Sequence, residues 1–150
     1  METMKLLDDK VVFLTGGSMG IGLECAKKYQ SNGARIMIMS NDGASLAKAL
    51  QILGINETQV VTGDVSQPVD VELAIKKTVT TFGKIDVIHN NAGLASPSVP
   101  LHETSDTEWA RLFDVNVKSI LLTARYGIEE LKKTKGCVIN TSSLVGEIGQ

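Results

Sequence analysis

Residues 15–22 read Thr15-Gly16-Gly17-Ser18-Met19-Gly20-Ile21-Gly22, and this stretch decides the fold of the chain. The apolar run Val11-Val12-Phe13-Leu14 precedes it, and residues 21–29 follow it with a helical pattern. The order is therefore strand, glycine turn and helix. At such a turn the unpaired N–H groups and the positive dipole end of the helix can receive a pyrophosphate.

Three glycines of this turn have separate geometric tasks. Gly16 permits a sharp turn with backbone angles that other residues resist. Gly20 removes a side chain that would keep a ligand away from the backbone, and Gly22 allows the helix to lie close to the strand. A tight turn without any ligand is the alternative, but a second apolar strand at residues 35–39 favours a dinucleotide site. The spacing is G-x-x-x-G-x-G, which differs from the commoner G-x-G-x-x-G.

The turn resembles the cofactor loop of the short-chain dehydrogenase/reductase family. Three later motifs agree with that family in type and order: N-N-A-G at 90–93, the V-N pair at 115–116 and S-x-x-G at 143–146. The resemblance covers nearly all of residues 10–149. It implies an α/β fold, a Rossmann-type doubly wound parallel sheet that is incomplete, with five strands in the order 3-2-1-4-5. It also implies hydride transfer between NAD or NADP and an alcohol or carbonyl substrate.

The resemblance assigns the cofactor to residues from four parts of the chain. Asp64 of the D-V pair would bind the adenine amino group, although an aspartate after a strand can also simply form a turn. Small Ala92 and Gly93 would permit close approach to the ribose, and the Asn91 amide would lock adjacent strand backbones together. The complete predicted set is Gly16, Ser18, Met19, Gly20, Ile21, Gly22, Ser40, Asn41, Asp64, Val65, Asn91, Ala92 and Gly93.

The end of the second strand bears on the choice between NAD and NADP. In dinucleotide folds an acid here accepts from the ribose hydroxyls, and a nearby arginine accommodates a 2′-phosphate. The corresponding family positions fall at about Ser40 and Asn41, which carry neither charge. Asp42 either reaches the ribose or caps the next helix. The lack of positive charge, also at Met19 in the turn, favours NAD.

Two residues match catalytic positions of the family. The S-x-x-G pattern selects Ser143 over Ser142, and its hydroxyl would hydrogen-bond the substrate oxygen. Asn116 would hold a water of the proton relay, or it is a structural amide that bonds backbone, and both roles are compatible. His89, at the end of the fourth strand where relatives commonly carry an apolar residue, is interpreted as a hydrogen-bonded packing residue.

The tyrosine of the family, with a lysine four residues later, does not occur within the 150 residues. Tyr29 lies in the first helix, and Tyr126 is followed four residues later by Glu130, whose charge would raise a phenol's pKa. The chain is therefore predicted to be the cofactor-binding part of an oxidoreductase, truncated before this motif. The alternative is a dinucleotide-binding module without turnover.

Composition agrees with one globular domain over residues 1–150. The chain is 43% hydrophobic and 21% charged with a net charge of −2, and it contains no basic block, so no nucleic-acid or membrane partner is expected. Cys25 and Cys137 match no metal spacing, so no metal site is expected, and a reducing cytoplasm is the expected compartment.

Secondary structure and assembly can also be predicted. Strands are expected at 11–15, 35–39, 60–62, from 85 and at 136–140. Helices are expected at 20–31, at 44–53, from a cap at Ser66 to Phe82, and from Asp106 to about Lys132. The last helix carries apolar residues on more than one side, which predicts a homodimer or homotetramer. Val138 and Ile139 are expected on an open apolar sheet edge.

Overall fold

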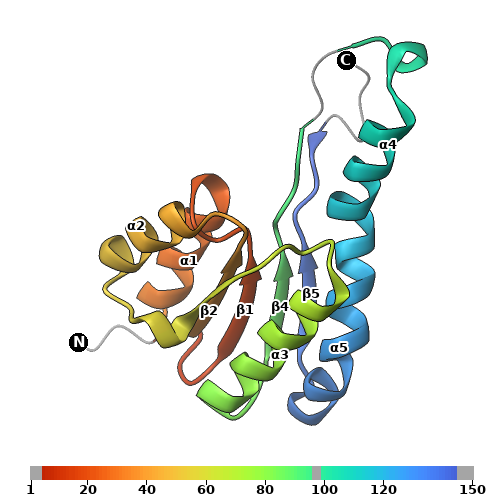
Figure 1. The fold of residues 1–150 in the computed structure, drawn as a ribbon. Coiled ribbons are helices and arrows are strands. Elements are labelled where there is room, and N and C mark those ends of the chain that lie inside the picture. The colour runs from red at the N-terminus through yellow and green to blue at the C-terminus, as the bar shows by residue number, and fades with distance from the viewer. Residues whose placement is uncertain (1–4, 96–98, 145–150) are drawn as a thin grey trace.

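The computed structural model describes residues 5–95 and 99–144. Five parallel strands form one sheet in the order β3-β2-β1-β4-β5, with every neighbouring pair parallel (Figure 1). This confirms the predicted α/β, Rossmann-type architecture and strand order. The strands are β1 (Val11–Thr15), β2 (Arg35–Ser40), β3 (Val60–Thr62), β4 (Val87–Asn90) and β5 (Cys137–Asn140).

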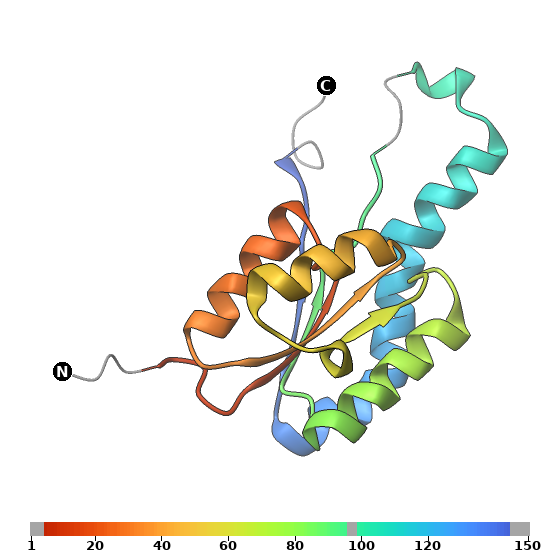
Figure 2. The ribbon, with the colours of Figure 1, turned by 60° about the vertical axis from the view of Figure 1, so that its left-hand side comes forward.

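Helices cover both faces of the sheet. Figures 1 and 2 show α1 and α2 on one face and α3 and α5 on the other, while α4 extends past the carboxyl ends of the strands. The helices are α1 (Gly20–Ser31), α2 (Gly43–Leu53), α3 (Pro68–Phe82), α4 (Asp106–Phe113) and α5 (Ser119–Thr134). Short 3₁₀ turns span Glu57–Gln59 and Leu101–Glu103.

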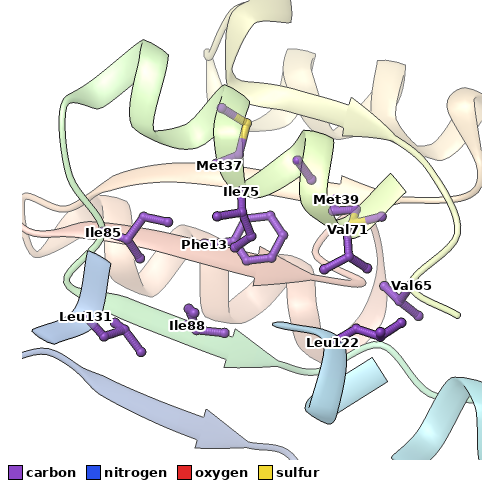
Figure 3. Close-up of a cluster of buried hydrophobic side chains, with 11 residues drawn as sticks. Phe13, Met37, Met39, Val65, Val71, Ile75, Ile85, Ile88, Leu122 and Leu131 are labelled. Carbon is purple, nitrogen blue, oxygen red and sulfur yellow. The ribbon is translucent and has the colours of Figure 1, made fainter. Parts of the chain in front are cut away.

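The central strands are buried on both faces, as expected for parallel strands between helical layers. Because side chains alternate along a strand, Val12 and Leu14 pack into the core under α1 and α2. Phe13 points the other way and joins Met37 and Met39 in the core under α3 and α5 (Figure 3). Both methionines are fully buried, which confirms that they fill the core.

Most helix ends follow the sequence signals. Gly54 and Gly83 adopt positive φ angles of 62° and 81° where α2 and α3 end. Ser105 accepts from the Glu108 backbone N–H at 3.2 Å and so caps α4. The expected cap of α3 at Ser66 is wrong by one residue, because Gln67 holds the cap position and Pro68 begins the helix.

The predicted helix from Asp106 to Lys132 is interrupted. A π-helical segment, Asp114–Lys118, separates α4 from α5. Its wider turn shifts the rotational register of the helix. Residues that a uniform helical period would place on one side therefore do not share a side across this segment. Trp109 and Phe113 are exposed, whereas Leu122 and Thr123 of α5 are buried against the sheet.

Strand β5 forms one end of the described sheet. Among the described strands it pairs only with β4, from Cys137 opposite Val87 to Asn140 opposite Asn90. Val138 and Ile139 are each 39% exposed, which confirms the predicted apolar edge in the described part of the chain. Among the described residues, no helix combines the length and apolar character required to cross a membrane.

Candidate functional site

The glycine turn between β1 and α1 contains two glycines, Gly16 and Gly22, whose close contacts leave no room for a side chain. Gly16 has a φ of 65°, and a Cβ on it would lie 2.8 Å from the Ala92 Cα. A Cβ on Gly22 would collide with the carbonyl oxygen of Gly16 and lie 2.5 Å from Asn91 Nδ2. Gly22 therefore packs α1 against the turn and the N-N-A-G segment.

A cavity of about 1090 Å³ lies beside this turn. Its volume is slightly above the range of about 300–1,000 Å³ found for ligand pockets. Gly20 does not line it: that residue has a φ of 52°, and a Cβ there would meet no described atom within 4 Å. All the other residues predicted for the cofactor line the cavity: Gly16, Ser18, Met19, Ile21, Gly22, Ser40, Asn41, Asp64, Val65, Asn91, Ala92 and Gly93.

Three buried serine hydroxyls meet at the end of β2. Ser18 donates to Ser40 at 3.0 Å, and Ser45 donates to Ser18 at 2.7 Å. The cluster joins the glycine turn to β2 and to the first turn of α2. Sequence reasoning selected Ser18 and Ser40 but missed Ser45, because nothing in the local pattern of α2 marks a residue that bonds to the turn.

The two aspartates considered for the cofactor both have structural duties. Asp42 caps α2, where its Oδ1 accepts from the backbone N–H groups of Ala44 at 2.9 Å and Ser45 at 3.3 Å. Asp64 Oδ1 accepts from the Ser66 N–H at 2.8 Å. The capping interpretation of Asp42 is thus confirmed. Both aspartates also line the cavity, so contact with a ligand stays a prediction for each.

The Asn91 amide joins β4 to β1 as predicted. Its Nδ2 donates to the carbonyl oxygens of Thr15 at 3.3 Å and Gly16 at 3.1 Å. Thr15 completes the junction, because its Oγ1 accepts from the backbone N–H groups of Asn91 and Ala92, both at 3.1 Å. These bonds hold the glycine turn and the N-N-A-G segment as one unit.

Helix α4 supplies a wall of the cavity that sequence reasoning missed. Arg111 in this wall donates from Nε and Nη2 to the Glu108 carboxylate at 2.9 and 2.8 Å. This bidentate pair lowers the pKa of Glu108. The apolar residues of this helix were used to predict a homodimer or homotetramer. They do not indicate that the polar side of α4 faces the cavity. The α4 wall and the turn after it contribute Asp106, Thr107, Ala110, Arg111, Asp114 and Val115.

A family model described as short chain dehydrogenase matches residues 10–150. The chain belongs to the short-chain dehydrogenase family. The match begins just before β1 and includes the glycine turn, the N-N-A-G segment and the S-x-x-G motif.

Individual relatives agree with this assignment. The chain is 36% identical to an L-fucose dehydrogenase of Mus musculus over 150 residues, covering 100% of this chain and 54% of that protein. It is 38% identical to an uncharacterized oxidoreductase of Thermotoga maritima, over 93% of this chain and 56% of that protein. A meso-2,3-butanediol dehydrogenase of Serratia marcescens is 32% identical over 93% of this chain and 55% of its own length. The chain therefore spans about half the length of these relatives.

The two predicted catalytic residues of this member of the family lie outside the described lining of the cavity. Ser143 is exposed, two residues beyond Thr141, which does line it. Asn116 lies in the π-helical segment, where its Oδ1 accepts from the Leu94 N–H at 2.8 Å and its Nδ2 donates to the Leu94 carbonyl at 2.9 Å. The backbone-bonding role of Asn116 is thus confirmed, and its role in a proton relay stays a prediction.

Proposed function

We propose that the full-length protein transfers a hydride between a nicotinamide dinucleotide, NAD or NADP, and an alcohol or carbonyl carbon of a small molecule. The observation that carries this proposal is the cavity at the glycine turn of a short-chain dehydrogenase chain. The relatives named L-fucose dehydrogenase and meso-2,3-butanediol dehydrogenase support a hydroxyl-bearing substrate. Residues 1–150 would form one dinucleotide-binding domain.

The residues around the turn fit such a cofactor. The first turn of α1 contains no acidic residue, and the cap residue Met19 makes no side-chain bond to the helix end. Gly16, Gly20 and Gly22 keep side chains away from the turn, so an anionic group can approach its backbone N–H groups. When bound, the nicotinamide ring supplies the atom that accepts or donates the hydride.

Ser143 and Asn116 would act on the substrate side. The Ser143 hydroxyl would donate to the substrate oxygen and stabilise the charge that develops on it. An amide has two N–H donors and two oxygen lone pairs. Leu94 uses one of each in Asn116, so the amide could still hold a relay water while it anchors residue 94.

The proposal is tested by following nicotinamide reduction with the purified full-length protein and a panel of sugars, diols and simple secondary alcohols. We expect turnover with at least one of these classes. Residues 1–150 alone contain no tyrosine followed four residues later by lysine, and we propose that they bind a dinucleotide without turnover. Dinucleotide binding with no turnover by the full-length protein would favour the non-catalytic alternative, and carbonyl reduction by residues 1–150 alone would contradict it.

The charges that line the cavity support NAD over NADP. Asp42 and Asp64 lie on the side of β2 and β3, and Asp106 and Asp114 lie on the helical side. Arg111 is the one cation among the described residues that line the cavity, and its guanidinium is paired with the Glu108 carboxylate. A 2′-phosphate would therefore meet more repulsion than attraction.

We expect Asn41→Arg to shift the preference towards NADP by about tenfold or more, because it places a cation beside the ribose corner. Titration of both dinucleotides against wild-type and variant protein measures the shift, with Asn41→Gln as the uncharged control. Equal or tighter binding of NADP by the wild-type protein would contradict the NAD preference.

Exposed apolar residues on the long helix support assembly into a homodimer or homotetramer. Trp109, Phe113, Val117 and Leu121 recur every four residues and are all exposed, and the rings of Trp109 and Phe113 stack with centroids 4.6 Å apart. A row of this kind is self-complementary across a two-fold axis. We propose that it packs against the same row of a second copy.

We expect Leu121→Lys to convert the full-length protein to monomers, because it places a charge within the apolar row that would be buried between the two copies. Ile52→Lys on α2 is the matched control, since Ile52 is 56% exposed and Leu121 is 55% exposed. Light scattering measures the mass. A wild-type monomer would contradict the proposed interface.

The compartment and partners follow from the proposed chemistry. The two cysteines are free, which agrees with a reducing cytoplasm as the proposed location. The proposed partners are the small-molecule substrate and a second copy of the chain, with no nucleic acid or membrane among them.

A further inference from the structure

A buried histidine stands at the junction of the glycine turn and the segment that carries Ser143. His89 is 5% exposed and lies on β4, between α1 and the residue that follows β5. Its Nδ1 is 2.9 Å from the Tyr29 hydroxyl, and its Nε2 is 2.9 Å from Thr141 Oγ1. The proposed reaction leaves this polar arrangement without a role.

The hydrogen-bond directions follow from the acceptors at the far end. Asn91 Nδ2 lies near the carbonyl oxygens of Thr15 and Gly16, which accept only, so the other end of this amide is its oxygen. That oxygen, Oδ1, accepts from the Thr141 hydroxyl at 3.2 Å. Since Thr141 has one hydroxyl proton and uses it on Asn91, its oxygen accepts from His89 Nε2–H.

The remaining bond defines the form of the histidine. With its proton on Nε2, a neutral imidazole has Nδ1 as an acceptor, and the Tyr29 hydroxyl donates to it. Burial raises the pKa of Tyr29, which keeps this donor protonated. Burial also lowers the pKa of His89, and no carboxylate of the described residues pairs with it. Besides His89, the titratable groups whose charges act on the Tyr29 hydroxyl are Cys25 on α1 and Cys137 on β5, and both raise the pKa of Tyr29 less than burial does.

We propose that His89 is a positioning residue whose Nε2–H fixes the Thr141 hydroxyl and thereby ties the Ser143 segment to the glycine turn. The tie runs from Tyr29 through His89 and Thr141 to Asn91, and from Asn91 to the backbone of Gly16. It rests on the proposed function in that Ser143 is taken to contact the substrate. Its effect is to hold the substrate-binding hydroxyl in register with the cofactor cavity.

The form of His89 is measured directly by nitrogen-15 NMR of the imidazole in the full-length protein at neutral pH. We expect a neutral ring with its proton on Nε2 and a loss of this signature in Thr141→Val. A proton on Nδ1, or a cationic ring, would overturn the proposal whether or not the protein turns over a substrate. Absence of turnover in the wild-type protein would instead contradict the proposed function.

Kinetics test the positioning role with a matched pair of variants. Glutamine keeps a donor near the position of Nε2, whereas asparagine is too short to reach Thr141. Small displacements of reacting groups lower the rate of the chemical step strongly. We therefore expect His89→Asn to lower kcat about ten- to hundredfold with little change in dinucleotide affinity. We expect His89→Gln to retain most of kcat. Equal kcat values for the two variants would overturn the proposal. If His89→Asn does not fold, Thr141→Val takes its place in the comparison with His89→Gln.

Discussion

Gly22→Ala is expected to abolish dinucleotide binding by the full-length protein. The added methyl would collide with the Gly16 carbonyl and lie 2.5 Å from Asn91 Nδ2, so α1 or the turn must move. Overpacking of this kind costs about 1–3 kcal/mol. The displaced turn would also lose the backbone geometry proposed to receive the pyrophosphate. Calorimetric titration and thermal unfolding measure the two effects.

Gly43→Ala is the control for this substitution. Gly43 begins α2, and a Cβ on it would meet no described atom within 4 Å. Gly43→Ala should therefore fold with equal or slightly higher stability and bind the dinucleotide as the wild type does. Wild-type affinity in Gly22→Ala would show that close packing at this turn is not needed for binding.

Ser143→Ala is expected to lower kcat of the full-length protein about 10²- to 10³-fold. This range is typical for removal of one hydrogen-bond donor that stabilises a developing oxyanion. Ser143 is exposed and does not line the cavity, so dinucleotide affinity should not change. Steady-state kinetics with a responsive alcohol, combined with a dinucleotide titration, separate the two quantities.

Ser142→Ala provides the comparison for the catalytic serine. It removes the same hydroxyl one residue earlier, on a residue that is also exposed. We expect it to keep kcat within a few-fold of the wild type. A larger loss in Ser142→Ala than in Ser143→Ala would mean that the S-x-x-G pattern selects the wrong serine.

The sheet could be predicted from sequence because buried parallel strands are continuous apolar runs. Val11–Leu14 and residues 35–39 are such runs, and both form buried strands. The glycine turn between them indicates that a helix connects the two strands. The π-helical segment could not be predicted, because a local widening of the helix leaves no mark in residue types. Its effect is visible at Trp109 and Phe113, which are exposed, and at Thr123, which is buried, although a uniform helical period would place all three on one side of the helix.

The candidate site could be predicted where one motif contains several of its members. The glycine turn and N-N-A-G satisfy this condition, and their residues meet at Gly16 and Ala92. Ser45 and Arg111 were not predicted, because each lies on a helix that contributes to the site through tertiary packing. The sequence pattern of a helix shows which of its sides are apolar but not which other segment each side contacts. His89 was correctly interpreted as a hydrogen-bonded residue, but its partners Tyr29 and Thr141 lie 60 and 52 residues away in sequence.

A crystal structure of the full-length protein grown with a nicotinamide dinucleotide would show whether the cavity at the glycine turn holds this cofactor. We expect the dinucleotide to occupy the cavity of about 1090 Å³, with its pyrophosphate against the backbone of residues 16–21 and its ribose beside Ser40 and Asn41. A dinucleotide bound elsewhere on the chain, or a cavity that stays empty at saturating dinucleotide, would contradict this expectation.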